Sequence, residues 1–452
     1  MIVISSGDSI FSYANHFQDA RCRLNSLHTV NNACTPGMIM KILHTSDWHL
    51  GHTFREQKRN REFASFFTWL ESVIKTEGID VLIMAGDVFD SGTPGNQALE
   101  LYFDFLGRIA KNPGCQVIIV AGNHDSPSLL TVPKSIFSPL DIHVIGSTGE
   151  RPDDEILVLN DRQGHPALIV GAVPFLRDRD VRMVEPGESI DDKTRKLLDG
   201  IKKHYHEVCA CAESLREKTG THIPLVVTGH LFAAGGKVAE DDGVREHYIG
   251  SLVRVRADTF LSGIDYLALG HLHIPQVVGN NPRWRYSGSP LPMGFSDAAD
   301  EKQVIVAEFN GSRVPEIREI RVPCFQKMEQ ITGTMDEITA RIRELKSQNQ
   351  PIWIEVILDD PSLVPDFRDQ IITLTKGTAL TVLGTKNLRL ADQVLMQASD
   401  EESLDQLTET DIFNRCLDAN DISPAERTEL LTLFAEILTE VKVNNAKPEE
   451  EV

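Results

Sequence analysis

The chain lacks the features that would place it in several protein classes. No apolar run approaches the roughly 20 residues that a membrane-spanning helix requires, so no membrane partner is expected. Its seven cysteines are an odd number without a CxxC pair, which argues against a disulfide framework or a zinc ribbon and fits a reducing compartment. No GxxxxGK(S/T) segment occurs, so an ATP-driven step would require a separate subunit.

The first 37 residues also lack a charged segment followed by a long apolar one, and a signal peptide is therefore not expected. We predict that residues 1–37 form a disordered extension before the first regular strand. The alternative is that they act as a regulatory arm.

The composition is that of an ordinary globular protein, but the charge is acidic and uneven. The 452 residues carry a net charge of −21, and the last 52 positions alone contain 14 acidic and 4 basic residues. One hydrophobic core rarely grows past about 250 to 300 residues, so we expect two or three domains. Because so much of the negative charge lies at one end, the net value does not exclude a basic patch elsewhere.

Five short apolar runs each stop at a cluster of Asp, His or Asn. A strand that carries ligand side chains at its carboxyl end is how an open sheet builds a site along one edge. The runs end at Asp47 and His49, at Asp87, at Asn123 to Asp125, at His230, and at His271 and His273. The repetition predicts one shared site.

These clusters supply oxygen and imidazole donors without thiolates, a set that suits Mn²⁺, Fe²⁺, Mg²⁺ or Zn²⁺. Side chains two positions apart point to the same side of an extended segment, so Asp47 with His49, and His271 with His273, can act as pairs. Seven donors are too many for one ion, whereas two ions about 3.5 to 4 Å apart that share a carboxylate would use all of them. Asp87 is the expected bridge, since Ala85 and Gly86 before it leave room.

Strand-like and helical patterns alternate along most of the chain. Between Met40 and Val322, helices are expected at 62–78, 96–112 and 191–218, which predicts an α/β layered domain over 38–322. The segments 283–295, 302–310 and 316–322 are expected to close this domain as antiparallel strands. From Pro323 a strand, helix, strand, helix, strand pattern predicts a small α+β domain over 323–390. Residues 391–409 are expected to be a linker, and 410–445 a pair of amphipathic helices. Their apolar stripe could pack on its own domain or on another protein.

The ordered set DWH, GD, GNHD, GH and GHLH resembles the signature of the calcineurin-like metallophosphoesterases. The forms HTSDWHLG, GDVFD, AGNHDS and YLALGHLH are most similar to the bacterial nuclease subunits of that family that act in double-strand-break complexes. The resemblance implies a four-layer α-β-β-α sandwich with a small α+β capping domain and a C-terminal helical hairpin.

The resemblance also implies a role for each donor. One metal would be held by Asp47, His49, Asp87 and His273, and the other by Asp87, Asn123, His230 and His271. His124 would not be a ligand but would act on the scissile phosphate and protonate the leaving oxygen. Asp125 could orient His124 by a hydrogen bond or could form an Asx-type turn, and Asp90 stands where archaeal and eukaryotic relatives have a histidine.

The function implied by the resemblance is that of a DNA nuclease with two divalent ions, expected to be Mn²⁺. It would be a 3′-to-5′ exonuclease on duplexes and an endonuclease on single strands and hairpins, acting in DNA end processing. Its partners would be a coiled-coil ATPase and a second copy of the chain, in a heterotetramer in the cytoplasm near the nucleoid. The alternatives are a stand-alone phosphoesterase acting on small nucleotides or phosphoproteins, and a scaffold without activity.

Two basic segments are considered as DNA contacts. The residues Arg55, Lys58, Arg59 and Arg61 place four cations just after the first ligand pair, which fits binding to phosphates without sequence preference. The alternative is a solvated helix start. The segment with Arg283, Trp284, Arg285 and Tyr286 is a weaker candidate and is expected to be a strand with a half-buried face.

Overall fold

The structure is a computed structural model that describes residues 39–111, 114–183, 187–219, 223–233, 260, 263–360 and 364–388, with scattered positions between 410 and 438. The predicted extension at 1–37 and linker at 391–409 lie outside the described residues, as does most of the predicted helical pair. No helix in the described part of the chain is both long enough and apolar enough to cross a membrane.

Two six-stranded sheets form the body of the molecule. The first has the order β14-β13-β1-β4-β5-β6 and the second the order β11-β12-β10-β9-β8-β7. The strands of the first sheet are β1 (Ile39–Thr45), β4 (Val81–Ala85), β5 (Gln116–Val120), β6 (Ile142–Ile145), β13 (Gln303–Asn310) and β14 (Glu316–Arg321). Those of the second are β7 (Ile156–Asn160), β8 (Pro166–Ala172), β9 (Leu225–His230), β10 (Tyr266–Gly270), β11 (Gln276–Val278) and β12 (Asn281–Tyr286).

The strand directions place the predicted ligands at a common edge. In the first sheet β1, β4, β5 and β6 run parallel, and β13 and β14 close the sheet antiparallel, as predicted. In the second sheet β8, β9, β10 and β12 run parallel. The prediction of an antiparallel closing strand is therefore wrong for β12 in its pairing with β10, although β12 does pair antiparallel with β11. Parallel strands bring their carboxyl ends to the same side of a sheet.

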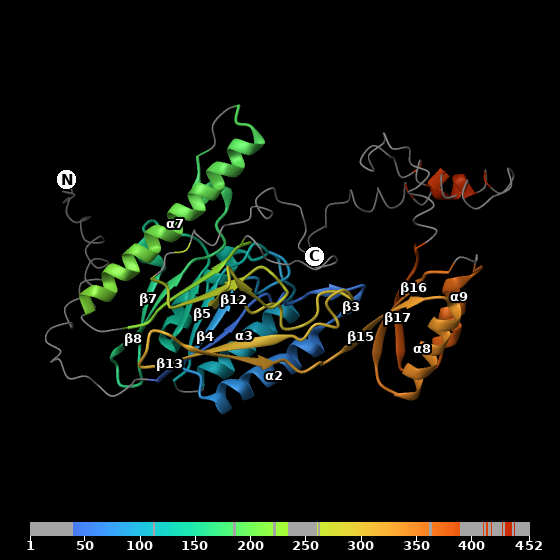
Figure 1. Ribbon diagram of the computed structural model, residues 1–452, viewed down its shortest axis with the longest axis horizontal. Helices are drawn as coiled ribbons and strands as arrows, with labels where there is room; N and C mark the ends of the chain where they lie inside the picture. The colour runs from blue at the N-terminus through green and yellow to red at the C-terminus, as the bar shows by residue number, and fades with distance from the viewer. Residues whose placement is uncertain are drawn as a thin grey trace, which may run out of the picture.

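Helices cover the outer face of each sheet and confirm the four-layer arrangement (Figure 1). The helices α2 (Asn60–Glu77) and α3 (Asn96–Ala110) pack on the first sheet through aromatic side chains such as Phe67 and Phe105. The long helix α7 (Ile190–Thr219) packs on the second sheet. A third apolar cluster fills the space between the sheets, so central strands such as β4, β5, β8 and β10 are buried on both faces and are almost entirely apolar.

Shorter elements connect these layers. They are α4 (Pro127–Thr131), α5 (Lys134–Phe137), η1 (Ser138–Leu140), η2 (Pro152–Glu155) and α6 (Asp178–Val181). The hairpin of β2 (Thr53–Phe54) and β3 (Gln57–Lys58) follows the first ligand pair.

A separate unit with its own apolar core lies at one end of the molecule (Figure 1). It consists of β15 (Lys327–Gly333), α8 (Met335–Ser347), β16 (Ile352–Leu358), α9 (Phe367–Thr375) and β17 (Leu380–Asn387). The alternation of strands and helices was predicted. The three strands all run parallel, so the unit is a βαβαβ arrangement, which is more specific than the α+β description drawn from the sequence.

The β2–β3 hairpin contacts this unit. The ring of Phe54 stacks on Trp353 with centroids 6.4 Å apart, and the guanidinium of Arg55 pairs with the buried carboxylate of Glu355. Arg55 also donates to the carbonyl oxygen of Leu383 at 3.3 Å. The hairpin therefore ties the body to the βαβαβ unit.

Within the predicted helical pair, the described residues are helical. The rings of Phe413 and Phe434 stack with centroids 4.0 Å apart. That contact is the kind expected between the two helices of a hairpin.

Candidate metal centre

The predicted ligands converge from both sheets. Asp47 and His49 follow β1, Asp87 follows β4 and Asn123 follows β5, while His230 ends β9 and His271 and His273 follow β10. All six Asp and His side chains among these seven residues are buried. The carboxyl edges of the two sheets thus meet at one group of buried polar side chains within a mainly apolar interior.

Two glycines make this convergence sterically possible. A Cβ atom on Gly86 would overlap the imidazole of His230, and one on Gly122 would overlap the carboxylate of Asp87. Gly86 also has a φ of 89°, a conformation that L residues rarely adopt. The space left by the missing side chain of Gly86 is therefore filled by the imidazole of His230, one of the predicted ligands.

The backbone is strained at the ligands themselves. Asp47, His49 and Asp87 have φ values of 53°, 49° and 54°, in the left-handed region that non-glycine residues seldom occupy. Such conformations persist where the surroundings hold them, and they concentrate at functional sites.

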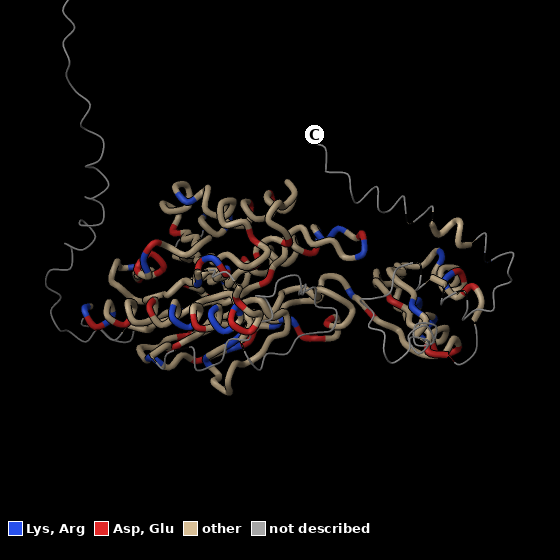
Figure 2. Tube along the Cα trace, turned by 90° about the horizontal axis from the view of Figure 1, so that it is seen from above, with Lys and Arg blue, Asp and Glu red and all other residues tan. Residues whose placement is uncertain are grey.

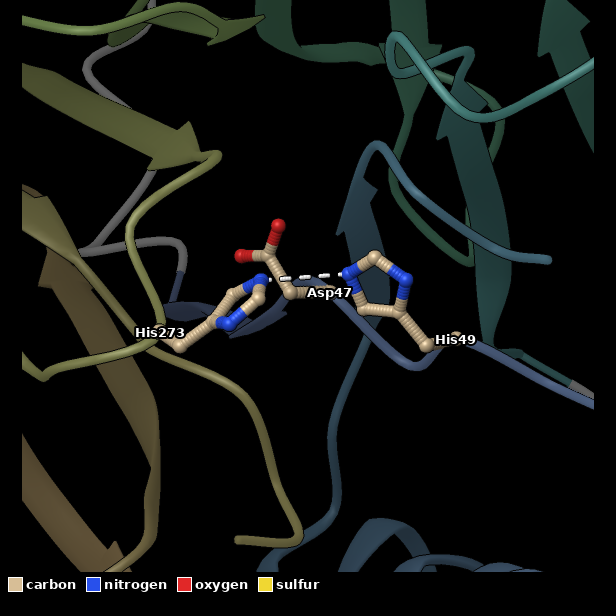
Figure 3. A group of neighbouring side chains, drawn as sticks. All are labelled: Asp47, His49 and His273. Carbon is tan, nitrogen blue, oxygen red and sulfur yellow. Dashed lines mark hydrogen bonds between the residues drawn. The ribbon is translucent and has the colours of Figure 1, made fainter. Parts of the chain in front are cut away.

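A first group of donors consists of Asp47, His49 and His273 (Figure 3). Nε2 of His49 and Nε2 of His273 lie 3.1 Å apart, and one oxygen of Asp47 lies within 4.8 Å of both rings' donor atoms. Figure 3 shows the two imidazoles facing each other with the carboxylate beside them.

A second group consists of Asn123, His230 and His271. The Oδ1 atom of Asn123 lies 2.9 Å from Nε2 of His230 and 3.1 Å from Nδ1 of His271, and these two nitrogens are 3.3 Å apart. Asp87 lies between the two groups, since its Oδ2 atom is 3.2 Å from Nε2 of His230 and 3.7 Å from Nε2 of His49. One carboxylate therefore reaches both groups, as a bridging ligand would.

The protons on two imidazoles are fixed by their other nitrogens. Nδ1 of His230 lies 2.9 Å from the carbonyl oxygen of Ala85, and because a carbonyl can only accept, Nδ1 must carry the proton. Nδ1 of His49 lies 3.3 Å from the carboxylate of Asp90, which is also an acceptor, so this nitrogen carries the proton as well. Both rings thus direct Nε2 into the centre, the arrangement in which histidine binds metals.

The electrostatics of the centre fit divalent cations. Burial lowers the pKa of His49, and it lowers the pKa of His271 to about 3, so both rings are neutral and able to coordinate. Burial also lowers the pKa of His230, but the carboxylates of Asp87 and Asp47 outweigh this effect and raise it to about 9. A proton on His230 therefore offsets part of the negative charge of Asp87 and Asp47, which bound metal ions would otherwise neutralise. Hard oxygen and imidazole donors around a shared carboxylate suit two divalent ions.

His124 lies beside the centre and is held by two contacts. Its backbone N–H donates to Oδ1 of Asp87 at 2.9 Å, and its Nδ1 donates to the carbonyl oxygen of Asp90 at 2.9 Å. A nitrogen of His124 lies within 4.8 Å of donor atoms of His49 and Asp87, so the ring is at the edge of the cluster.

The expected hydrogen bond from Asp125 to His124 needs correction. The carboxylate of Asp125 instead accepts from the backbone N–H groups of Gly122, Val88 and Phe89, at 2.8, 3.1 and 3.0 Å. It therefore fixes the loop of Asn123 against the turn after Asp87. Burial and the nearby Asp87 raise the pKa of Asp125 to about 6, although these three hydrogen bonds oppose the rise.

Several supporting residues were not found from the sequence. Asp90, noted only as a departure from the relatives, accepts from His49 and from Nδ1 of His52 at 3.1 Å. The Oγ atom of Ser46 donates to Oδ2 of Asp47 at 2.5 Å, and the buried ammonium of Lys302 donates to the carbonyl oxygen of His273 at 3.2 Å. No local pattern marks this role of Lys302, because His273 lies 29 residues away in sequence.

The basic segment after the first ligand pair is divided between two roles. Arg55 is paired with Glu355, and Arg59 is buried, paired with Glu62 and bonded to the carbonyl oxygen of Pro292. The expectation is therefore wrong for Arg59, whose guanidinium is buried, while the guanidinium of Arg55 is 30% exposed but already paired with a carboxylate. Lys58 and Arg61 are exposed.

The second basic segment is a strand, as expected. In β12, Arg285 pairs with Glu319 and Tyr286 is buried, while Arg283 and Trp284 are half-buried. Over the described part of the chain, basic and acidic residues are interspersed (Figure 2).

Two family models match this chain. The calcineurin-like phosphoesterase model matches residues 40–275, and a model described as the type 5 capsule protein repressor C-terminal domain matches residues 324–421. The first match contains all seven predicted ligands. The second contains the βαβαβ unit and continues beyond it.

Curated relatives match over most of their own length. The SbcD subunit of the nuclease SbcCD from Escherichia coli strain K12 is 33% identical over 401 residues, which is 88% of this chain and 98% of the relative. Proteins of the same name from Rhodobacter capsulatus and Bacillus subtilis are 32% and 28% identical, over 69% and 71% of this chain and 77% and 80% of those relatives.

Proposed function

We propose that this chain, which belongs to the calcineurin-like phosphoesterase family and within it to the SbcD subunits of the nuclease SbcCD, hydrolyses DNA. The observation that carries the proposal is the buried set of donor atoms around Asp87, with His124 beside it. Family membership and this donor set together identify the chain as a phosphoesterase with a site for two divalent metal ions.

The proposed assignment of ligands follows the two groups in the structure. One ion would be held by Asp47, His49, Asp87 and His273, and the other by Asp87, Asn123, His230 and His271. Mn²⁺ is the ion that we propose, because the resemblance to the SbcD nucleases implies it and because the donors are among those that suit it. When bound, two such ions supply the positive charge that activates water and neutralises the phosphate oxygens.

The residues of the chain then perform the remaining steps. Nδ1 of His124 carries one proton, which it donates to the carbonyl oxygen of Asp90. The other ring nitrogen, Nε2, is therefore the atom that would carry a second proton and donate it to the leaving oxygen. The backbone N–H of His124 is bonded to Asp87, which fixes the distance between the proton donor and the ligands. Ser46 orients Asp47, and Lys302 supports the segment of His273.

The proposed substrates are the ends and hairpins of double-stranded DNA. The activity would be a 3′-to-5′ exonuclease on duplexes and an endonuclease on single strands and hairpins, in recombination, repair and replication. The proposed partner is an SbcC-type ATPase, since the relatives are named as subunits of SbcCD. Its docking site would be the helical segment 410–445. We further propose a homodimer within a heterotetramer, formed through α2 and α3.

The nuclease is favoured over a stand-alone phosphodiesterase acting on small nucleotides. The relatives carrying the nuclease name match 69% or more of this chain, well beyond the metal-binding body. A stand-alone enzyme would not need the matched segment at 324–421.

The test is hydrolysis of labelled duplex and hairpin DNA with Mn²⁺, with and without the ATPase partner, beside a His124→Ala control. We expect the wild type to degrade DNA and the control to be slowed by about 100-fold or more, since general acid catalysis contributes about 10²- to 10⁴-fold. Equally slow DNA degradation by both proteins, together with good hydrolysis of a small phosphodiester, would exclude the nuclease function.

A further inference from the structure

The loop that follows β8 lies against the loop that carries Asn123 and His124. Val173 donates its N–H to the carbonyl oxygen of Thr228 at 3.0 Å, and Phe175 donates its N–H to that of Ala121 at 2.8 Å. The guanidinium of Arg177 donates to the carbonyl oxygen of Asp125 at 3.2 Å. These bonds fix the segment from Val173 to Asp178 at the side of the centre formed by Asn123, His230 and His271.

Arg177 differs from the other arginines near it. Arg179 pairs with Asp180, and Arg182 pairs with Asp178 and Glu188. Arg177 is half-buried, and within the described residues its guanidinium has a carbonyl oxygen as partner but no carboxylate within ion-pair distance. Among the described residues, its charge is therefore not neutralised by an ion pair, although the carboxylate of Asp180 accepts the backbone N–H of Arg177 at 2.9 Å. In a chain with a net charge of −21, a cation of this kind beside the proposed catalytic loop is well placed to bind an anion.

The side chain of Phe175 contacts one of the proposed metal ligands. Its ring lies edge-on to the imidazole of His230, with centroids 6.2 Å apart and an interplanar angle of 76°. The side chain is half-buried, and it belongs to none of the four apolar clusters formed by the described residues. A partly exposed aromatic ring that contacts a proposed metal ligand and lies outside the apolar clusters can stack on a nucleobase.

We infer that Phe175 and Arg177 form a substrate-binding contact for the nucleotide next to the scissile phosphate. Arg177 binds the phosphate of that nucleotide, and Phe175 supports its base. Both contacts are independent of sequence, because every nucleotide has a phosphate and every base a flat face. The inference rests on the proposed function, since it requires a nucleic-acid strand at the metal centre.

The experiment compares two substrates in each variant: single-stranded DNA and bis(p-nitrophenyl) phosphate, a diester with no neighbouring nucleotide. We expect Arg177→Gln to lower kcat/KM for DNA at least tenfold further than for the small diester, and Arg177→Lys to restore much of the difference. The slope of log kcat/KM for DNA against log salt should fall by about 0.7, the value for one lost phosphate contact on a single strand. Arg179→Gln, which removes an exposed arginine two positions away, is the matched control and should change neither substrate.

Phe175 is tested by Phe175→Leu, which keeps an apolar side chain beside His230. We expect this variant to lose about fivefold or more in kcat/KM on normal DNA, and Phe175→Tyr to restore it. The loss should disappear on DNA with an abasic nucleotide next to the cleaved bond.

The inference is wrong if Arg177→Gln changes both substrates by the same factor or changes neither. It is also wrong if the loss in Phe175→Leu is the same on abasic DNA. These outcomes differ from failure of the proposed function, in which the wild type hydrolyses the small diester but not DNA.

Discussion

The carboxylate of Asp90 lies 3.3 Å from Nδ1 of His49, while the opposite nitrogen of that ring faces His273. The same carboxylate accepts from His52, and the carbonyl oxygen of Asp90 accepts from His124. Burial alone would raise the pKa of Asp90, but hydrogen bonds from His49 and His52 hold it below its usual range. A single residue thus connects a proposed metal ligand with the proposed proton donor.

Asp90→Ala should therefore weaken metal binding. Removing the carboxylate frees the ring of His49 to rotate or to change tautomer, and such partners of metal-bound histidines are worth about 10- to 100-fold in affinity or activity. We expect the Mn²⁺ concentration that gives half-maximal diesterase activity to rise by about tenfold or more. Asp104→Ala, on the exposed face of α3, is the control. An unchanged Mn²⁺ dependence in Asp90→Ala would contradict this role.

The contact of Arg55 with Glu355 should stabilise the association of the body with the βαβαβ unit. Glu355 is fully buried and also accepts from Gln330, so removing Arg55 leaves a buried carboxylate with fewer partners. We expect Arg55→Met to lower the free energy of unfolding by about 1 to 3 kcal/mol, measured by urea denaturation. Arg318→Met, which removes a half-exposed pair with Glu77, should cost less than about 1 kcal/mol. An equal loss of unfolding free energy in the two variants would show that the contact with Glu355 stabilises the protein no more than an exposed ion pair does.

The buried pair of Asp297 and Lys302 should make stability depend on pH. Burial would raise the pKa of Asp297, but the ammonium of Lys302, at 2.6 Å, and two backbone N–H groups lower it below the usual value. A carboxyl with a depressed pKa stabilises the fold above its unfolded pKa of about 3.9, and this stability is lost as the pH falls through the folded pKa. Asp297→Asn should therefore be less stable than the wild type at pH 7, with a smaller difference at pH 3. Thermal unfolding at both values measures this, and a constant difference would refute it.

Removal of residues 401–452 should separate the chemistry from the assembly. The proposed ligands all lie before residue 274, so hydrolysis of a small phosphodiester should remain. Association with an SbcC-type ATPase, measured by co-purification, should be lost. Retained co-purification would exclude the helical segment as the docking site.

The sequence was sufficient for the alternation of strands and helices and for the position of the centre, because both follow from local patterns, whereas the four layers were implied by the family resemblance. Apolar runs with polar ends, such as the one that stops at Asp87, identify buried strands and the edge at which their side chains meet. The helices at 62–78 and 191–218 were predicted within a few residues because their apolar periodicity and terminal signals are local, such as Gly78 with its left-handed φ of 65°.

The sequence was not sufficient for contacts between distant segments. Arg55 and Arg59 were expected to face DNA, but their partners Glu355 and Pro292 are 300 and 233 residues away. For Asp125 the sequence offered only local partners, either His124 or an Asx-type turn, yet its oxygens accept from Val88 and Phe89, 37 and 36 residues earlier. Charge and adjacency in sequence do not reveal which groups will be buried together.

In the proposed centre, Asp87 joins two groups of ligands into one site for two metal ions. The most direct measurement is the number of Mn²⁺ ions bound per chain, determined by elemental analysis after equilibrium dialysis and located by anomalous diffraction. We predict two ions per wild-type chain, on either side of Asp87, and fewer than one tightly bound ion in Asp87→Ala. A single ion in the wild type, or two ions that persist in Asp87→Ala, would contradict the account.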